Sequence, residues 1–375
     1  MNKKIVFLLL TVFIFLNVTA QHKLHLSIHS LPPSTAKNDI IYIAGTFNNW
    51  NPKDENYRFT RDSYGNYSVD LPVKEKTGEY KLTRGGWDKV ESDKDGNGIG
   101  NRQYNVEAND LLGIIVSGWA DHFAPKQKIS TASKNVKIID TAFYIPQLKR
   151  KRSIRIYLPD DYLVSNKRYP VLYMHDGQNL FDQLTGFAGE WGVDEFMDST
   201  KIKKAIIVGI DNGGNKRMNE YNPYDHKTYG AGEGGQYVDF LVKSLKPFID
   251  KKYRTLKDKQ NTSISGSSMG GLISFYALVK YPSVFGAAGV YSPAFWTAPD
   301  LFESVKTKGK LINSKIYFFA GKLEGDRMVN DALKMYQAMR KVSKSKMKLV
   351  IKDEGKHNEA TWRKDFPDFY RWINF

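Results

Sequence analysis

A serine set between glycines is the first feature of this 375-residue sequence that could carry out chemistry. Residues 266–270 read GSSMG and fit the pattern G-x-S-x-G, with Ser268 in the middle. A β-prone segment precedes the pattern, and apolar residues at helical spacing follow it as far as Pro282. A strand, a sharp turn and a helix are the context that exposes a nucleophilic serine. Ser268 is therefore the predicted nucleophile.

A serine nucleophile needs a base and an acid that orients the base. In α/β-hydrolases the order along the chain is serine, acid, histidine. Of the seven histidines only His357 follows Ser268, and it comes just after the last predicted strand. The acid should follow the predicted strand 315–320. Glu324 is the predicted acid, and Asp326 remains the alternative.

The negative oxygen that forms during acyl transfer needs backbone N–H donors. The N–H after the nucleophile belongs to Met269, and a second donor should come from the loop after the third strand. That loop reads VLYMHDGQNLFD, so the second donor is Gln178 or Gly177. We interpret His175 and Asp176 as residues that shape this loop.

The elements that must position these residues fill the second part of the chain, where apolar strands alternate with amphipathic helices. The predicted strands are 136–139, 153–158, 171–174, 205–210, 262–265, 286–291, 315–320 and 347–351, and the long predicted helices are 236–251 and 328–341. Such alternation predicts an α/β fold with a mostly parallel sheet covered on both faces. Sites on such sheets lie at the carboxyl ends of the strands.

The beginning of the chain predicts export. Lys3 and Lys4 precede an apolar run at 5–16, and small residues end at Ala20. This pattern is typical of a cleaved signal peptide over 1–20, too short to span a bilayer. A secreted or periplasmic protein is expected, with no membrane span in the mature chain. The sequence has no cysteine, so a disulfide framework is excluded.

The composition limits the classes of binding partner that can be expected. The net charge is +16, but the basic residues are scattered and no nucleic-acid-binding motif is present. The charge could still attract an anionic substrate. The segment 92–98 (SDKDGNG) begins like a calcium loop, yet Tyr104 stands where the bidentate carboxylate would be needed. We expect no metal and no cofactor.

Between 21 and 125 the pattern is one of short strands and turns, which predicts a small β-sandwich before a hydrolase domain at 126–375. The segment GTFNNWNP…GEYKLTRGGWDKVE…GNGIGNRQYNV resembles starch- and glycogen-binding modules with an immunoglobulin-like fold. The resemblance implies a sugar platform made of Trp50, Trp87, Lys81 and Asn101 and a possible α-glucan partner. The alternative is that both tryptophans are core or domain-interface residues.

The second domain also resembles a known family. YPVLYMHDGQNLFD, IIVGIDNGGNKRMNEYNPY, SISGSSMGGLISFYALVKYPSVFGAAGVYSPAFW and GKHNEATW are similar to the putative esterase family of α/β-hydrolases. That family includes siderophore (enterochelin-type), feruloyl and acetyl-xylan esterases. The resemblance implies that Arg217, Glu220 and Tyr221 line the pocket.

Three tryptophan and phenylalanine residues are candidates for an aromatic wall of the pocket: Trp191, Phe295 and Trp296. Each of them could equally be a packing residue.

The expected function is that of a secreted serine esterase acting on a carbohydrate or a carbohydrate-linked acyl group. A siderophore esterase is the second hypothesis. A non-catalytic glycan-binding protein is the third, and the intact serine, histidine and acid candidates disfavour it.

Overall fold

The computed structural model describes residues 22–48, 50–73, 76–106, 113–124, 129–186, 189–373 and 375. The chain forms two compact units, Met1–Gln127 and Lys128–Phe375. The expected signal peptide at 1–20 lies outside the described residues. Within the described part of the chain, no helix is long and apolar enough to cross a membrane.

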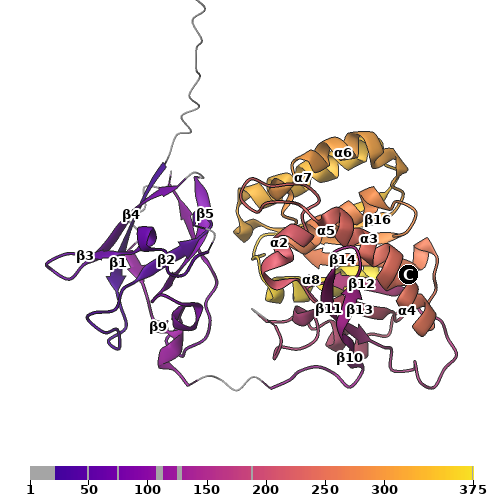
Figure 1. Ribbon diagram of the computed structural model, residues 1–375, viewed down its shortest axis with the longest axis horizontal. Helices are drawn as coiled ribbons and strands as arrows, with labels where there is room; N and C mark the ends of the chain where they lie inside the picture. Colours follow the sequence, from indigo (N-terminus) through magenta and orange to yellow (C-terminus); the bar gives the residue numbers. More distant parts are fainter. Residues whose placement is uncertain are drawn as a thin grey trace, which may run out of the picture. The chain divides into compact units, whose positions relative to one another are not determined.

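The first unit is an all-β sandwich (Figure 1). One sheet has the order β3 (Thr60–Arg61), β4 (Tyr67–Val73), β1 (His22–Ser30) and β8 (Gly113–Ile115), and a second has β2 (Tyr42–Gly45), β5 (Thr77–Thr83) and β7 (Arg102–Asn105). A short pair, β6 (Glu91–Ser92) and β9 (Gly118–Trp119), completes the described strands. Inward residues such as Leu26 of β1 and Leu82 of β5 join one core, because side chains alternate between the two faces of a strand.

The second unit has the α/β-hydrolase fold predicted from the sequence. Its eight-stranded sheet runs in the order β10 (Val136–Ile145), β11 (Arg150–Tyr157), β13 (Ile206–Ile210), β12 (Val171–His175), β14 (Thr262–Ser267), β15 (Ala287–Tyr291), β16 (Lys315–Gly321) and β17 (Lys346–Lys352). The pairs β10–β11 and β11–β13 are antiparallel, and the remaining pairs are parallel. Each predicted strand corresponds to one of these eight.

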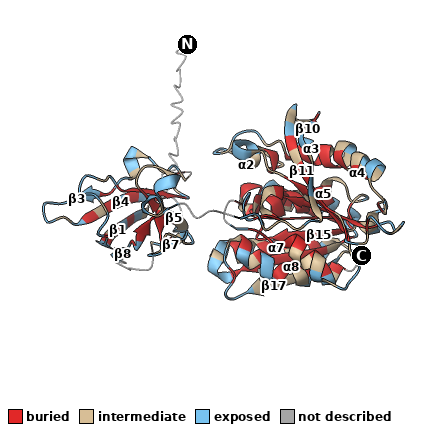
Figure 2. Cartoon of the chain, turned by 90° about the horizontal axis from the view of Figure 1, so that it is seen from below, coloured by how far each residue is buried: buried red, intermediate tan, exposed pale blue. Residues whose placement is uncertain are grey.

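Helices cover both faces of this sheet. They are α1 (Val193–Ser199), α2 (Arg217–Glu220), α3 (Gly234–Phe240), α4 (Lys246–Lys252), α5 (Met269–Lys280), α6 (Asp300–Lys308), α7 (Asp326–Val342) and α8 (Glu359–Ile373). Phe318 of β16 joins the core formed with α3 to α7, while its neighbour Phe319 joins the core formed with α1 and α8. The central strands β12 to β16 are therefore buried on both sides, as the red core in Figure 2 shows, whereas the edge strands β10 and β17 are partly exposed.

One predicted helix is interrupted. The segment 236–251 was expected to be continuous, but a π-helical turn at Leu241–Leu245 separates α3 from α4. Pro247 lies in the first turn of α4, where its missing N–H removes a helical hydrogen bond and the ladder shifts register.

Candidate active site

The turn from β14 into α5 holds Ser268 in a strained backbone conformation. Its φ of 60° and ψ of −122° are rare for a residue with a side chain. The turn is tight, since a Cβ atom on Gly266 would lie 2.9 Å from the carbonyl carbon of Gly270. On Gly271 a Cβ would lie 2.5 Å from the oxygen of Tyr291. Close backbone approach thus requires glycine at 266 and 271 of this strand–helix turn, while a Cβ atom on Gly270 would lie 3.2 Å from side-chain atoms of His175 and Asp176.

His357 and Glu324 lie in contact at the carboxyl ends of β17 and β16. The Nδ1 atom of His357 lies 2.6 Å from the Oε2 atom of Glu324, whose side chain is only 1% exposed. The carboxylate accepts, so Nδ1 carries the proton and Nε2 is the nitrogen that can act as a base. Asp326, the alternative acid, is exposed in the first turn of α7. The structure therefore brings Glu324 to the histidine.

Two residues that sequence reasoning missed orient this carboxylate. Ser292 donates its hydroxyl to Oε1 of Glu324 at 2.8 Å, and the backbone N–H of Gly321 donates to the same oxygen at 2.7 Å. The indole Nε1 of Trp362 donates to Ser292 at 3.0 Å, and its ring packs edge-on against His357 with centroids 5.1 Å apart. The available signal was the position of Ser292 directly after β15, at the carboxyl end of the strand beside β14.

The predicted oxyanion loop begins with Asp176 in a left-handed conformation, at φ 56° and ψ 49°. A single 3₁₀ turn, Gly177–Asn179, follows. A side chain on Gly177 would lie 2.8 Å from the backbone of Ile210, so only glycine fits there. Gln178 accepts from the backbone N–H of Asn212 at 3.2 Å through its side-chain oxygen. The backbone N–H groups of Gly177 and Gln178 stand at the start of the 3₁₀ turn, where N–H groups have no acceptor within the turn.

Met269 opens α5 in the same way, and its side chain is buried. The first N–H groups of a helix have no acceptor within the helix and point toward its N-terminal end. Met269 and the 3₁₀ turn therefore supply backbone donors of the kind that an oxyanion requires.

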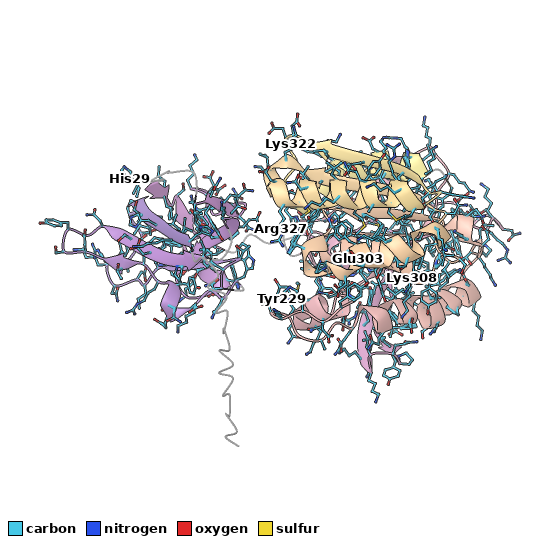
Figure 3. All side chains as sticks on the ribbon, turned by 90° about the horizontal axis from the view of Figure 1, so that it is seen from above. His29, Tyr229, Glu303, Lys308, Lys322 and Arg327 are labelled. Carbon is cyan, nitrogen blue, oxygen red and sulfur yellow. The ribbon has the colours of Figure 1, made fainter. Side chains whose placement is uncertain are left out.

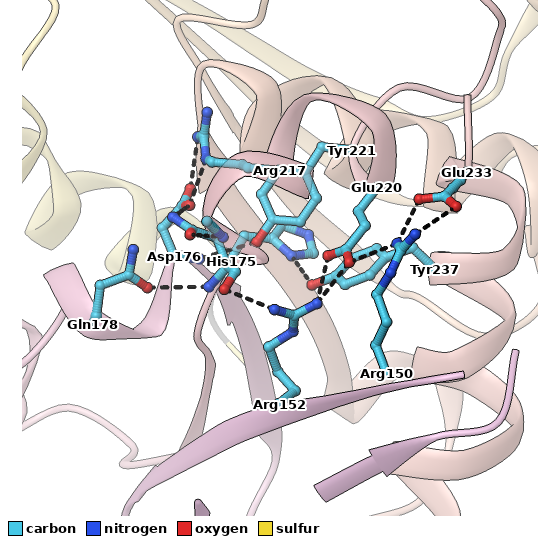
Figure 4. Close-up of polar contacts among 12 residues, drawn as sticks. Arg150, Arg152, His175, Asp176, Gln178, Arg217, Glu220, Tyr221, Glu233 and Tyr237 are labelled. Carbon is cyan, nitrogen blue, oxygen red and sulfur yellow. Dashed lines mark hydrogen bonds and ion pairs between the residues drawn. The ribbon is translucent and has the colours of Figure 1, made fainter. Parts of the chain in front are cut away.

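Arg217 clamps the oxyanion loop through Asp176 (Figure 4). Its Nε and Nη2 atoms lie 2.7 and 2.8 Å from the two carboxylate oxygens, and the side-chain amide of Asn212 donates to the carboxylate at 2.8 Å. Burial acts to raise the pKa of Asp176, but the Arg217 charge and the hydrogen bonds from Arg217 and Asn212 together lower it. The Nη2 atom of Arg217 also lies 3.5 Å from the backbone oxygen of Ser267, and its expected role in lining the pocket stays a prediction.

Two other expected pocket residues are buried instead. Glu220 is fully buried and accepts from Arg152 and Arg150, at 2.6 and 2.9 Å, in an ion-pair cluster behind the loop. Tyr221 is also fully buried and packs against His175, with ring centroids 5.2 Å apart. Both support the loop rather than line a pocket, because the last residue of α2 and the residue after it face inward.

His175 itself is an internal residue. Its Nδ1 lies 2.9 Å from the hydroxyl of Tyr237, and its Cβ atom would be 3.2 Å from a Cβ on Gly270. Burial lowers the pKa of His175 to about 3, so the imidazole is neutral at physiological pH. The side chain shapes the loop and packs against the elbow, as expected.

Of the three residues of the expected aromatic wall, two lie in the core and one lies at the surface. Trp191 is 3% exposed and stacks on Trp362, and Phe295 is fully buried, so both serve packing. Trp296 is half-buried and lines a cavity together with Arg327. Of these residues Trp296 is the one with an accessible face.

In the first unit the two tryptophans of the expected sugar platform come together. The rings of Trp50 and Trp87 have centroids 6.4 Å apart, Trp87 is exposed, and neither belongs to the sandwich core. Lys81 donates to the carbonyl of Ile99, and burial lowers its pKa. Asn101 is exposed and donates to Glu79 at 3.0 Å. No group of three or more potential metal-ligating residues occurs among the residues that could be described.

Known proteins resemble both the sequence and the fold. Uncharacterized protein YbbA of Bacillus subtilis is 23% identical over 240 residues, 59% of this chain and 92% of the relative. An endo-1,4-beta-xylanase/feruloyl esterase of Xylanibacter ruminicola is 24% identical over 233 residues, 60% of this chain and 30% of the relative. An alpha-amylase of Niallia circulans is 45% identical over 94 residues, 24% of this chain and 7% of the relative.

Two solved structures share the fold. The BES protein from Bacillus cereus has a TM-score of 0.55 at 22% identity and covers 68% of this chain and 99% of that one. The enterobactin esterase FES from Shigella flexneri has a TM-score of 0.55 at 14% identity and covers 94% of this chain and 92% of that one. The model of the family described as putative esterase matches residues 145–373. With the fold and this match together, the chain belongs to the putative esterase family of α/β-hydrolases and is a carboxylic ester hydrolase.

Proposed function

We propose that the protein is a secreted serine esterase in which Ser268, His357 and Glu324 form the catalytic triad. The observation that carries the proposal is the contact of 2.6 Å between His357 and Glu324, which follow the parallel strands β17 and β16, while the strained Ser268 follows β14 of the same sheet. Nε2 of His357 takes the hydroxyl proton while Ser268 attacks the ester carbonyl, and it then returns the proton to the departing alcohol. Water hydrolyses the resulting acyl-enzyme by the same route.

The backbone N–H groups of Met269 and of Gln178 or Gly177 hold the negative oxygen of the tetrahedral intermediate. Asp176 and Arg217 keep the loop that carries the second donor in place. This support matters because an oxyanion donor acts only when it is held in position before the reaction begins.

The test is burst release of p-nitrophenol from p-nitrophenyl acetate. Wild-type protein should release one equivalent rapidly, and Ser268→Ala should lower turnover on the order of 10⁶-fold with an unchanged melting temperature. Ser267→Ala is the matched control. A dead Ser267→Ala protein beside an active Ser268→Ala protein would move the nucleophile by one residue. The absence of both a burst and steady-state release in the wild type would favour the non-catalytic glycan-binding alternative.

We further propose that the ester sits on a carbohydrate or a carbohydrate-linked acyl group, and that the first unit binds α-glucan. The adjacent Trp50 and Trp87 rings support this, because flat aromatic faces suit the C–H surfaces of sugars. The similarity to an alpha-amylase and to a xylanase/feruloyl esterase supports it as well. A siderophore ester is the alternative, supported by the basic charge, which would attract an anionic complex. Turnover on acetylated sugars, feruloylated oligosaccharides and a catecholate triester separates these substrates.

Affinity electrophoresis in glycogen tests the sugar platform. Wild-type protein should be retarded, and Trp50→Ala with Trp87→Ala should abolish retardation while melting temperature and small-ester turnover stay near wild type. A core role would instead cost about 3–5 kcal/mol per tryptophan. No retardation of the wild type would exclude α-glucan binding.

Export is tested separately, by N-terminal sequencing of the protein recovered outside the cytoplasm. The expected first residue is close to Gln21.

A further inference from the structure

A buried glutamate lies two residues after the proposed base. Glu359 is the first residue of α8 and is 8% exposed. Asn358 accepts a hydrogen bond from the backbone N–H of Thr361 at 3.0 Å, as an N-cap residue does. Because the cap sets where the helix starts, His357 and Glu359 are held on one short segment. The fold therefore places a second carboxylate near His357, in addition to Glu324.

This carboxylate contacts the proposed oxyanion turn. The side-chain amide of Asn179 donates to Oε1 of Glu359 at 3.1 Å. Asn179 is the last residue of the 3₁₀ turn Gly177–Asn179, and its backbone N–H donates to the oxygen of Asp176 at 2.8 Å. The contact thus joins the segment that carries the base to the turn that carries the proposed second oxyanion donor.

Two further contacts hold the first turn of α8 against the chain that follows the oxyanion turn. The ring of Trp362 stacks on that of Trp191 with centroids 5.7 Å apart, and Nη1 of Arg363 lies 3.2 Å from Oε1 of Glu190. The backbone N–H of Trp191 also donates to the oxygen of Asn179 at 2.8 Å. These contacts fix the separation between the base and the oxyanion side of the site, and an oxyanion donor must be held in this way.

The charge of Glu359 acts on the base and on the clamp of the oxyanion loop. Burial raises the pKa of Glu359, and the negative charge of Asp176 adds to the rise. The backbone N–H of Glu359 and the charges of His357 and Arg217 act in the opposite direction. A carboxylate that interacts with an imidazole in this way favours the protonated form of the ring.

The other charges on the neighbouring segments are paired with partners of their own. Lys322, labelled in Figure 3, lies 2.8 Å from Asp353, and both side chains are exposed, so solvent screens their effect. On α8 the charge of Arg363 is paired as described above. A change of charge at Glu359 should therefore be felt directly by His357.

We propose that Glu359 is a second acidic positioning residue of the active site, which joins the base to the oxyanion turn through Asn179 and favours the imidazolium form of His357. The proposal rests on the proposed function, since His357 must be the base that takes the hydroxyl proton. The two parts of the role are separable. The bond to Asn179 needs an acceptor oxygen, whereas the effect on His357 needs a charge.

Glu359→Gln removes the charge and keeps an oxygen that can accept from Asn179. The assay is the pH profile of kcat/KM for p-nitrophenyl acetate. The acid limb should move to lower pH by about 0.5–1 unit, because the imidazolium has lost a favourable charge. The plateau kcat should stay within about tenfold of the wild-type value.

Asn179→Ala makes the opposite change, because it removes the donor and keeps the charge. It should lower kcat about 10- to 100-fold, since a partly displaced oxyanion donor stabilises the intermediate less. Its acid limb should stay at the wild-type pH. Glu359→Leu lacks both the acceptor and the charge and should show both effects.

Glu190→Gln is the matched control. Glu190 is 7% exposed, contacts the same helix through Arg363 and accepts from the hydroxyl of Thr131 at 2.8 Å. Its kcat and its acid limb should equal those of the wild type, whatever the change in melting temperature.

An acid limb that does not move in Glu359→Gln, or an unchanged kcat in Asn179→Ala, overturns the proposal. Equal effects of Glu190→Gln and Glu359→Gln on the pH profile would overturn it too, by showing that general destabilisation is the cause. A His357→Gln protein with normal turnover would instead refute the proposed triad, so the two failures are distinguishable.

Discussion

Replacing Arg217 by methionine tests whether the Asp176–Arg217 pair positions the oxyanion loop. The substitution keeps an apolar stem but removes both guanidinium hydrogen bonds, at 2.7 and 2.8 Å. Asp176, with 9% of its side chain exposed, then keeps its charge without this partner. The loop that carries Gly177 and Gln178 loses its fixed end.

The expected loss in the free energy of unfolding follows from the burial of the two charges. Removing one member of a buried ion pair costs about 3–5 kcal/mol, because the other charge stays buried. The Arg217 side chain is 23% exposed, so solvent screens part of the interaction. We therefore expect the lower end, about 3 kcal/mol, which in a domain of this size lowers Tm by about 6–12 °C. Displacing an oxyanion donor lowers kcat by about 10²- to 10³-fold, so a partial displacement should cost about 10- to 100-fold.

The assay combines thermal melts with kcat and KM for p-nitrophenyl acetate. The double variant Asp176→Asn/Arg217→Met should regain more than half of the lost stability, since no unpaired charge remains. Arg217→Lys keeps the charge without the two-pronged geometry and should fall between wild type and Arg217→Met.

Lys246→Met is the matched control, because Lys246 pairs with Asp250 at 2.7 Å on α4 with similar burial. It should lower stability but leave kcat unchanged. An Arg217→Met protein with normal kcat and a raised KM would refute the positioning role and make Arg217 a substrate contact. Equal losses of kcat in Arg217→Met and Lys246→Met would show that general destabilisation is the cause.

Two further predictions concern the triad acid and a buried histidine. Glu324→Gln should lower kcat on the order of 10⁴-fold, as loss of the orienting acid does, while Asp326→Asn has little effect; equal mild effects would place the acid elsewhere. Burial lowers the pKa of His175 from 6.5 to about 3, so between these values the unfolded chain binds one more proton than the folded chain. The free energy of unfolding is therefore unaffected by this proton above pH 6.5. It falls by about 1.4 kcal/mol per pH unit as the pH is lowered toward 3. The free energy of unfolding, measured by chemical denaturation at several pH values in this range, should change less steeply with pH for His175→Gln than for the wild type. The matched control His226→Asn, on a partly exposed turn, should change as steeply as the wild type. An equal pH dependence in all three proteins would contradict the assignment.

Local patterns were sufficient to predict much of this protein. The strand–turn–helix context of Ser268 predicted the tight turn, because it depends only on the glycines and on the apolar residues that flank it. The eight strands were predicted because each is an apolar run long enough to cross the sheet. The order of the strands in the sheet is set by the fold. It pairs β16 with β17, so the segments that follow these two strands lie close together at their carboxyl ends.

Tertiary structure alone decided which side chains meet. Glu324 and Asp326 are two residues apart, and only the turn after β16 directs the former toward His357 and leaves the latter exposed. Ser292 could be connected to Glu324 only through the packing of neighbouring strands. Glu220 and Arg217 share one turn of α2, yet one is buried among arginines and the other clamps Asp176. Sequence periodicity records which residues prefer burial, whereas the direction of a polar side chain depends on partners that are distant in the chain and are brought near only by folding.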